Sequence, residues 1–413
     1  MSNLSRKYAC RICGDELLED VLSFGRMPLA NLLLTYEELD KPELTYPLDL
    51  VRCPSCSLVQ ITETVAPEVL FREYLYFSSF SDTMLRHASE LVERIIHMKS
   101  LSHGNLVVEI ASNDGYLLQH YKKSQIPVLG IEPATNVARL AREKLGIPTI
   151  TEFFDTSLAA DLAAKGQKAD VIHMHNVLAH VSNLHSVVEG VRLLLKEDGL
   201  CVIEVPYLKK LIEQCEFDTI YHEHLCYFSL TSLVYLMKCH ELSIVDVEQI
   251  PIHGGSLRLF VKHDVEVSIQ ASVQALLDEE IRWGLLKKEI YSGFSDRALK
   301  LKIEFRNLIQ DLKRRGKRIA AYGAAAKGST LLNYFEIGKE WIDFVVDRNV
   351  YKQNRFMPGV RIPIFSLAKI EELMPEYIVL LVWNFSEEVL QQQASYRRRG
   401  GHFIFPIPEI KIV

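Results

Sequence analysis

Residues 106–115 read LVVEIASNDG, a run of apolar residues that passes into a polar turn ending in glycine. A helical pattern begins directly afterwards, near Tyr116. Parallel sheets bind nucleotide-like ligands at such a strand-turn-helix junction, because backbone N–H groups and the positive end of the helix dipole converge there. Only the last glycine of the usual glycine-rich turn is present, so the turn alone does not identify the ligand.

The segments that follow continue the alternation of strand and helix. Residues 128–132 form a second apolar strand that ends in Glu132, 17 residues after Gly115. A carboxylate at an offset of roughly 20 residues is the one that binds ribose hydroxyls in such folds. Alternation of this kind predicts an α/β fold with a parallel sheet and a nucleotide-like ligand at its carboxyl edge. Further strands are expected at residues 147–151, 169–174 and 199–205.

Polar and aromatic residues follow several of these strands. Phe154 stands where an aromatic ring can stack on adenine, although two consecutive phenylalanines belong more often to a core. Asn176 and His180 follow the fourth strand, in an otherwise apolar stretch at the edge of the sheet where ligands bind. The candidate cofactor contacts are Glu109, Ser112, Asn113, Asp114, Gly115, Glu132, Pro133, Phe154 and Asn176.

A second polar stretch, TIYHEHLCYF at residues 219–228, comes after the fifth strand and a helical segment, so chain order places it at the same sheet edge. It brings Tyr221, His222, Glu223 and His224 together, all of which can transfer protons. A half-buried, hydrogen-bonded turn is the alternative. A zinc site is a third reading, but the His-Glu-x-x-His spacing of metallopeptidases is absent.

Four of the eight cysteines form two Cys-x-x-Cys pairs, separated by 39 residues: Cys10 with Cys13, and Cys53 with Cys56. Two such pairs predict a tetrahedral zinc site, whose four thiolates leave no position open for a substrate. A redox pair is the alternative, but thioredoxin-type motifs open a helix after a strand, and neither pair has that flank. The predicted metal is therefore structural.

Three further segments carry weaker signals. Residues 73–81 are rich in aromatic and hydroxyl side chains, and Tyr76 is a candidate to cover a ligand; the alternative is that this segment packs the zinc module against the next domain. The loop that contains His253 and Arg258 offers backbone amides and a cation to an anion, unless it is an ordinary glycine turn. Residues 265–316 are helical in pattern and highly charged, as expected of a connector between domains.

A second strand-turn-helix junction lies near the C-terminus. Residues 318–322 form an apolar strand, and the turn GAAAKG at residues 323–328 matches Gly-x-Ala-x-x-Gly. It is not a Walker loop, because Ser329 stands where that motif needs lysine. The turn resembles a Rossmann opening in which Lys327 and Gly328 meet a phosphate. Strands expected at residues 341–346, 377–383 and 402–405 complete a smaller α/β domain.

Composition limits the function classes. A chain of 413 residues is expected to form two or three domains, and 48% hydrophobic with 24% charged residues indicates a globular protein. A net charge of −6 argues against general nucleic-acid or membrane-surface binding. No apolar run approaches the roughly 18 residues that span a bilayer, and no signal peptide is apparent, so a cytoplasmic protein with reduced thiols is expected.

Taken together, these motifs resemble the sugar C-methyltransferases of deoxysugar biosynthesis, and they occur in the right order along essentially the whole chain. The resemblance implies a zinc-binding module at residues 1–70, a class I methyltransferase domain for S-adenosylmethionine at 71–264, the helical connector at 265–316 and a Rossmann-like nucleotide-sugar domain at 317–413. The motifs are the two cysteine pairs, PLAN at 28–31, EIASNDG at 109–115, GIEP at 130–133, NVLAH at 176–180, YHEH at 221–224, HGGS at 253–256 and YGAAAKG at 322–328.

The family resemblance further implies a nucleotide-linked keto sugar, most often thymidine-diphosphate-linked, that is methylated on the carbon next to the ketone. This carbon must lose a proton before it attacks a methyl group, so the site needs a base and a stabiliser for the enolate oxygen. We expect His224 to be the base, with Glu223 orienting or tuning it, and Tyr221 and His180 forming hydrogen bonds with the sugar or the enolate. Tyr221 or His222 could replace His224 as the base.

The expected substrate contacts are Tyr76, His253, Arg258, Lys327 and Gly328. An O- or N-methyltransferase acting on another small metabolite is the alternative within the same class. A non-catalytic scaffold that binds sugar nucleotides is the alternative from another class. No nucleic acid or membrane partner is expected, and the chain is expected to be a monomer or a small homo-oligomer.

Overall fold

A computed structural model describes residues 8–71, 77–265 and 267–413. Its N-terminal module is an antiparallel sheet in the order β1-β2-β3-β9. The first cysteine pair precedes β1, and the second lies in the turn between β2 and β3. The last strand of this sheet comes from a distant part of the chain, directly after the YHEH stretch. The strands are β1 (Glu19–Pro28), β2 (Thr45–Arg52), β3 (Val59–Ile61) and β9 (Cys226–Tyr227).

The central domain is a seven-stranded sheet in the order β10-β11-β8-β7-β4-β5-β6. The strands from β6 to β8 are parallel, whereas β11 is antiparallel to both β8 and β10. Because β5 and β7 flank β4, the strand order reverses there, which is where such sheets bind ligands. The strands are β4 (Val107–Ile110), β5 (Val128–Ile131), β6 (Thr149–Ile150), β7 (Ala169–His175), β8 (Leu195–Pro206), β10 (Leu242–Ile250) and β11 (Ser256–His263).

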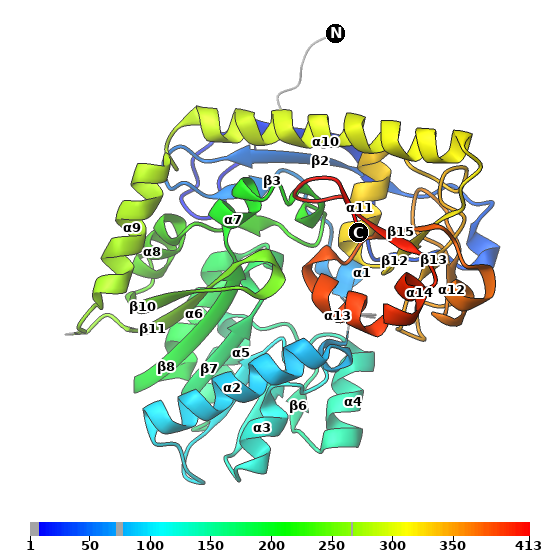
Figure 1. The fold of residues 1–413 in the computed structure, drawn as a ribbon. Helices are drawn as coiled ribbons and strands as arrows, with labels where there is room; N and C mark the ends of the chain where they lie inside the picture. Colours follow the sequence, from blue (N-terminus) through cyan, green and yellow to red (C-terminus); the bar gives the residue numbers. More distant parts are fainter. Residues whose placement is uncertain (1–7, 72–76, 266) are drawn as a thin grey trace.

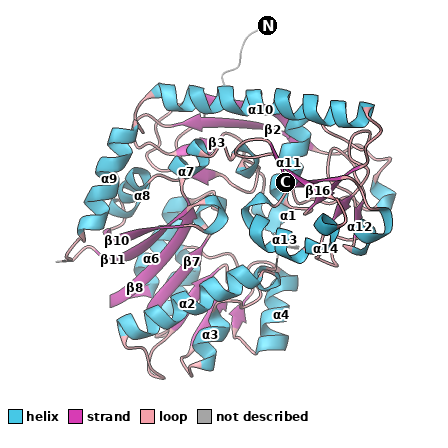
Figure 2. Cartoon of the chain, viewed as in Figure 1, coloured by secondary structure: helices cyan, strands magenta, loops and turns pink. Residues whose placement is uncertain are grey.

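Helices cover both faces of this sheet (Figures 1 and 2). Successive residues of a strand point to opposite faces, so Val107 packs with α2 and α3 while Val108 packs with α5 and α6. Such strands are apolar throughout because neither face meets water. The helices of the domain are α2 (Asp82–Lys99), α3 (Leu118–Lys123), α4 (Thr135–Leu145), α5 (Thr156–Ala164), α6 (Leu184–Leu194), α7 (Leu208–Glu213) and α8 (Leu230–Lys238), with α1 (Pro67–Phe71) before them.

The C-terminal domain has a smaller sheet in the order β14-β13-β12-β15-β16-β17, parallel except for β17. Its order reverses at β12, which leads through a short turn into α11, the helix that carries Lys327. The strands are β12 (Ile319–Tyr322), β13 (Val345–Val346), β14 (Ile364–Phe365), β15 (Tyr377–Leu380), β16 (His402–Phe405) and β17 (Lys411–Ile412), and the helices are α11 (Ala326–Phe335), α12 (Ala368–Leu373), α13 (Ser386–Gln392) and α14 (Ala394–Arg398).

Two helices join the central and C-terminal domains: α9 (Ala271–Trp283) and α10 (Lys288–Arg314). In Figure 1 α10 runs along the top of the molecule, above β2 and on towards α11. Its buried residues include Tyr291, Phe294 and Ala298, a helical spacing that gives one apolar face along the helix. This face contacts β1, α7 and α11, so one helix packs against all three modules.

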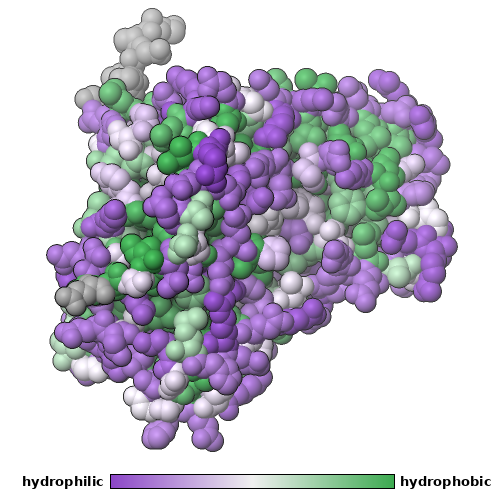
Figure 3. Space-filling model, turned by 60° about the vertical axis from the view of Figure 1, so that its left-hand side comes forward, coloured by the Kyte–Doolittle hydropathy of each residue, from purple (hydrophilic) through white to green (hydrophobic). Residues whose placement is uncertain are grey.

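The three sheets share one continuous hydrophobic core, which includes Leu50 of β2, Ile203 of β8 and Val345 of β13. Hydrophilic residues cover most of the face seen in Figure 3, with hydrophobic residues in small groups among them. Within the described ranges, no helix is long and apolar enough to cross a membrane. The predicted architecture of a zinc-binding module followed by two α/β domains is confirmed.

Candidate active site

The turn after β4 adopts a backbone that few side chains tolerate. Ala111 and Asn113 have positive φ angles of 55° and 50°, and Gly115 has a φ of 82°. A Cβ atom on Gly115 would lie 2.4 Å from the Cδ1 atom of Ile147. The backbone angle therefore favours glycine at this position, and a side chain there would have to displace Ile147. The consequence is a tight turn that leaves room at the sheet edge.

A cavity of about 440 Å³ opens at this edge, where the strand order reverses. Five of the nine predicted cofactor contacts line it: Asn113, Glu132, Pro133, Phe154 and Asn176. Its volume, its aromatic and apolar walls and the carboxylate of Glu132 at the end of β5 suit an adenosine-containing ligand. These residues therefore fit S-adenosylmethionine.

The other four predicted cofactor contacts lie behind the cavity wall. Glu109 is almost fully buried, and burial together with the charges of Glu132 and Asp114 raises its pKa well above the usual value. The carboxylate of Asp114 accepts hydrogen bonds from the backbone N–H and hydroxyl of Ser79. Gly115 and Ser112 shape the turn. All four support the site from outside the residues that line the cavity.

Glu132 is held by backbone amides. Its Oε2 accepts from the N–H of Asn113 at 2.9 Å, and its Oε1 accepts from the N–H of Ala134 at 2.8 Å. Burial raises its pKa to about 7. The side-chain oxygen of Asn113 in turn accepts from the backbone N–H of Ser78 at 2.9 Å. The segment before α2 is thus fastened onto the turn after β4.

A second cavity, of about 310 Å³, adjoins the first. The two share Asn176, His180 and His253 in their walls. All three modules contribute to the second cavity: Asn31 from the N-terminal module, Tyr221 and His224 from the central domain, and the turn at residues 322–327 from the C-terminal domain. A substrate in this cavity would therefore lie next to a cofactor in the first.

Tyr221 and His224 form a hydrogen-bonded pair in the wall of the second cavity. The Nδ1 atom of His224 lies 2.7 Å from the carbonyl oxygen of Thr219, which can only accept, so Nδ1 carries the proton. The neutral ring then has its lone pair on Nε2, which accepts from the Tyr221 hydroxyl at 3.0 Å. Burial lowers the pKa of His224 well below its usual value, and the nearby His180 lowers it further. The ring is therefore a neutral proton acceptor.

Glu223 is not the hydrogen-bond partner of either ring nitrogen of His224, as an orienting role would need. Both ring nitrogens of His224 are engaged, by Thr219 and Tyr221, so the backbone carbonyl of Thr219 sets its tautomer. The two carboxylate oxygens of Glu223 accept from the side-chain amide of Asn31 at 2.8 and 2.9 Å. Glu223 therefore fastens the stretch to the N-terminal module. Asn31 belongs to the PLAN motif, but a backbone carbonyl such as that of Thr219 leaves no sequence signal.

The other histidines differ in position. His222 is buried with its Nε2 atom 3.0 Å from the carbonyl oxygen of Pro47, away from the residues that line either cavity. The ring of His180 meets that of His224 edge-on, with centroids 4.7 Å apart. Burial lowers the pKa of both His180 and His253 to about 4, so both are neutral in a wall common to the two cavities. His222 is thus removed from the candidate bases.

The predicted substrate contacts have separate outcomes. Lys327 lines the second cavity, and its ammonium group is buried without a hydrogen-bond partner among the described residues. Gly328 lies behind it, where a Cβ atom would come 2.8 Å from the Cβ of Leu381, so this glycine allows α11 to pack closely. Tyr76 lies outside the described residues.

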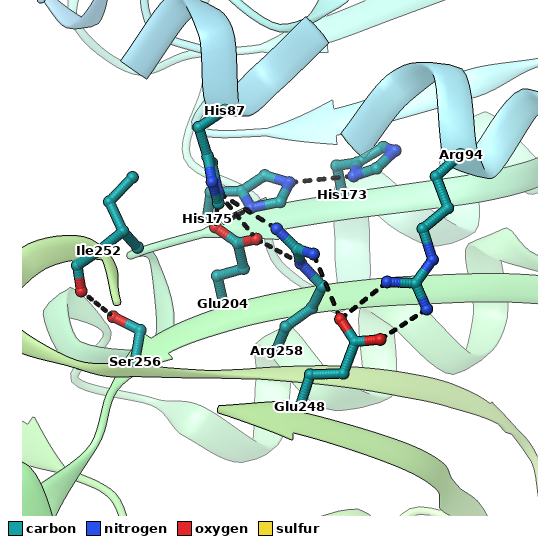
Figure 4. A network of polar contacts seen from close by, with 9 residues as sticks. All are labelled: His87, Arg94, His173, His175, Glu204, Glu248, Ile252, Ser256 and Arg258. Atoms are coloured by element: carbon teal, nitrogen blue, oxygen red, sulfur yellow. Dashed lines mark hydrogen bonds and ion pairs between the residues drawn. The ribbon is translucent and has the colours of Figure 1, made fainter. Parts of the chain in front are cut away.

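Arg258 belongs to a buried ion-pair network that reaches His175 in the wall of the cofactor cavity, so it does not act as the predicted substrate contact (Figure 4). Its Nε donates to Glu204 at 2.7 Å, and its Nη1 donates to Glu248 at 3.3 Å. Glu204 also pairs with His87 on α2 and with His175 at the end of β7. The guanidinium of Arg258 therefore neutralises the carboxylates of Glu204 and Glu248 and is not available to a ligand.

The four cysteine sulfurs cluster as predicted. The Sγ atoms of Cys10 and Cys56 are 3.3 Å apart, those of Cys13 and Cys53 are 3.4 Å apart, and all four lie within 4.8 Å of one another. In a tetrahedral zinc site with zinc–sulfur bonds of about 2.3 Å, the sulfur atoms lie roughly 4 Å from one another. The cluster therefore fits a zinc ion with no open coordination position.

Family models match the chain in three consecutive segments. They describe a zinc binding domain at residues 10–71, a methyltransferase domain at residues 83–247 and a C-methyltransferase C-terminal domain at residues 251–408. The C-methyltransferase NovU of Streptomyces niveus is 36% identical over 405 residues, which are 98% of this chain and 96% of the relative. The chain belongs to the C-methyltransferase family. The resemblance seen in its motifs is confirmed, and the protein is an S-adenosylmethionine-dependent C-methyltransferase with a zinc-binding N-terminal domain.

Solved structures match less than half of the chain. Magnesium protoporphyrin IX methyltransferase from Synechocystis PCC 6803, with bound S-adenosylhomocysteine, is 14% identical with a TM-score of 0.34 over 43% of this chain and 81% of its own. The PH0226 protein of Pyrococcus horikoshii OT3 is 14% identical with a TM-score of 0.36 over 48% of this chain and 96% of its own. The assignment of this C-methyltransferase to its family rests on the sequence matches alone.

Proposed function

We propose that this C-methyltransferase methylates a sugar linked to a nucleoside diphosphate, on the carbon next to a ketone. The observation that carries the proposal is the Tyr221–His224 pair, which lines a cavity that shares Asn176, His180 and His253 with the proposed cofactor cavity. When bound, S-adenosylmethionine supplies an electrophilic methyl group and leaves as a neutral thioether. Because a C–H bond next to a ketone is only weakly acidic, the protein must supply the base.

His224 is the proposed base. Its Nε2 lone pair takes the proton from the sugar carbon, and the electron pair of that C–H bond moves to the ketone oxygen as an enolate. The enolate carbon then forms the bond to the methyl group, and the imidazolium returns its proton to solvent. The carbonyl of Thr219 supports this role, because it accepts from Nδ1 in both the neutral and the protonated ring.

Tyr221 is the proposed partner of the ketone oxygen. Its hydroxyl lies on Nε2 of His224 at 3.0 Å, so a substrate that brings its α-hydrogen to Nε2 displaces the hydroxyl towards the neighbouring carbonyl. A hydrogen bond there stabilises the enolate more than the ketone, which is what accelerates proton removal. His180 has a buried Nδ1 without a hydrogen-bond partner among the described residues and makes a backbone hydrogen bond with Glu223. This Nδ1 atom is placed to accept a hydrogen bond from a sugar hydroxyl.

The diphosphate is proposed to bind at the start of α11. Lys327 supplies a buried cation there. The free backbone N–H groups in the first turn of this ten-residue helix add the positive end of the helix dipole to the same site. Ala326, the residue before Lys327, packs against Tyr221. A diphosphate at this turn would therefore hold its attached sugar next to the Tyr221–His224 pair.

A panel of substrates tests the proposal. The protein is incubated with S-adenosylmethionine and keto sugars linked to different nucleoside diphosphates, and the products are analysed by mass spectrometry and carbon NMR. We expect one added methyl group on a carbon next to the ketone. A methyl group on oxygen or nitrogen, or methylation of the free keto sugar as efficiently as of its nucleotide form, would contradict it.

A further inference from the structure

Trp383 touches two functional elements at once. It lies in a short 3₁₀ helix, Trp383–Phe385, that follows β15 in the C-terminal domain. Its indole Nε1–H donates to Oδ2 of Asp218 in the central domain at 2.7 Å. The ammonium group of Lys327 lies over its ring, 4.4 Å from the centroid. One side chain therefore joins a carboxylate of one domain to a lysine of another.

Asp218 is next to the residue that sets the tautomer of His224. It belongs to the 3₁₀ helix Phe217–Thr219, whose last residue presents its carbonyl to Nδ1 of His224. This short helix packs against α11, which carries Lys327. The hydroxyl of Thr219 donates to the carbonyl of Glu216 at 2.8 Å, which fixes the turn on its other side. The Asp218–Trp383 bond is thus a polar contact between this turn and the C-terminal domain, beside the packing of Phe217 against Tyr334 and Phe335.

The electrostatics around Trp383 favour a rigid link. Asp218 is fully buried; burial raises its pKa to about 6, and the charge of Lys327 opposes that rise. Glu216 is buried beside it, and burial raises its pKa to about 7 against the same opposing charge. Among the residues that the structure describes, Nζ of Lys327 has no hydrogen-bond partner, and neither has Oε1 of Glu216 or Oδ1 of Asp218. The neutral indole of Trp383 donates a hydrogen bond to Asp218 and lies against the ammonium group of Lys327. It therefore connects two charged groups that are not in direct contact.

We infer that Trp383 is a positioning residue through which the C-terminal domain holds His224 as a proton acceptor. The indole bond fixes Asp218, and the fixed turn keeps the carbonyl of Thr219 on Nδ1, so that Nε2 keeps its lone pair. The same ring holds Lys327 at the start of α11. The base and the proposed diphosphate site are thus aligned by one side chain. This inference rests on the proposed function for its link to catalysis.

The first test measures the histidine in the substrate-free protein. Nitrogen-15 NMR of labelled histidine distinguishes a protonated Nδ1 from a protonated Nε2, and His224→Gln assigns the signal. In Trp383→Phe, which keeps an aromatic ring under Lys327 but lacks the N–H donor, we expect the single tautomer to become a mixture. Asp218→Asn, which keeps an acceptor oxygen for the indole, should retain more of the native tautomer than Asp218→Ala. A native tautomer in Trp383→Phe would overturn the inference whatever the substrate proves to be.

The second test measures catalysis. Without the methyl donor, the rate of solvent deuterium incorporation next to the ketone should fall about 10-fold or more in Trp383→Phe, the loss expected for a hydrogen bond to a charged group. The substrate KM should change much less, because Lys327 keeps its ring. Trp341→Phe, the same change elsewhere in the C-terminal domain, should match the wild type. An unchanged rate in Trp383→Phe would overturn the inference, whereas no exchange in the wild type would overturn the proposed function and leave the NMR test to decide the role of Trp383.

Discussion

At the scale of single residues, hydrogen-bond partners separate groups that the sequence cannot tell apart. The YHEH stretch contains two histidines two positions apart, and either could be the base. The structure directs His222 to the carbonyl of Pro47 and Glu223 to the amide of Asn31, leaving Tyr221 and His224 in the cavity wall. These partners come from residues far away in the sequence or from the backbone. The sequence therefore predicts a stretch that contributes to the cavity wall, but not the hydrogen-bond partner of each of its residues.

The first prediction concerns pH. Burial lowers the pKa of His224 well below the 6.5 of an ordinary histidine, so the ring stays neutral as the pH falls through that value. The rate of deuterium incorporation at saturating substrate should therefore stay level from about pH 8 to about pH 6.5 and fall only below that range. Circular dichroism at each pH identifies any loss due to unfolding. An acid limb centred at or above the ordinary histidine value in folded protein would contradict this assignment.

At the scale of elements, periodicity predicts most of the strands, and local turns account for the errors. The strand at 402–405 is predicted at its observed bounds, His402–Phe405. The strand predicted at 341–346 is reduced to Val345–Val346, because the N–H groups of Trp341 and Ile342 turn back onto the carbonyl of Gly338. The strand predicted at 377–383 ends at Leu380, and Trp383 enters a 3₁₀ helix. Apolar runs therefore locate buried segments, but they do not determine the residue at which the hydrogen-bonded pairing of a strand ends.

The second prediction concerns α11. Lys327→Met keeps most of the length of the side chain but removes its charge, so the substrate KM should rise about 10-fold or more, as expected for the loss of a charge-assisted hydrogen bond. Affinity for S-adenosylmethionine, measured by calorimetry, should not change, because Lys327 is absent from the lining of the cofactor cavity. Lys339→Met, at an exposed position after the same helix, is the matched control. An unchanged KM would remove Lys327 from diphosphate binding.

At the scale of the whole molecule, the site is assembled from modules that the sequence presents separately. β9 adds to the N-terminal sheet directly after the YHEH stretch, and the N–H of Ile61 donates to the carbonyl of Leu225 at 3.0 Å. The sequence predicts each module from its own motifs. It gives no sign that a strand of one completes the sheet of another, because such pairing joins residues far apart in the chain.

The third prediction follows from this pairing. Loss of zinc should disturb β3 and, through β9, the Tyr221–His224 pair, so stability and methyl transfer should fall together. Cys53→Ser is expected to lower the metal content and to lower the Tm by roughly 5 °C or more, as the loss of a few kcal/mol would. Cys239→Ser, at an exposed cysteine after α8, should change neither. Full activity and unchanged Tm in a metal-free Cys53→Ser protein would refute a structural role.

The central claim is that His224 removes a proton from the sugar carbon before any methyl group is transferred. The most direct measurement is incorporation of solvent deuterium into a nucleotide-linked keto sugar without S-adenosylmethionine. Wild-type protein should incorporate deuterium next to the ketone, His224→Gln should do so at least about 100-fold more slowly, and His222→Gln should remain within about threefold of the wild type. Undiminished exchange in His224→Gln, with methyl transfer still dependent on the protein, would contradict the account.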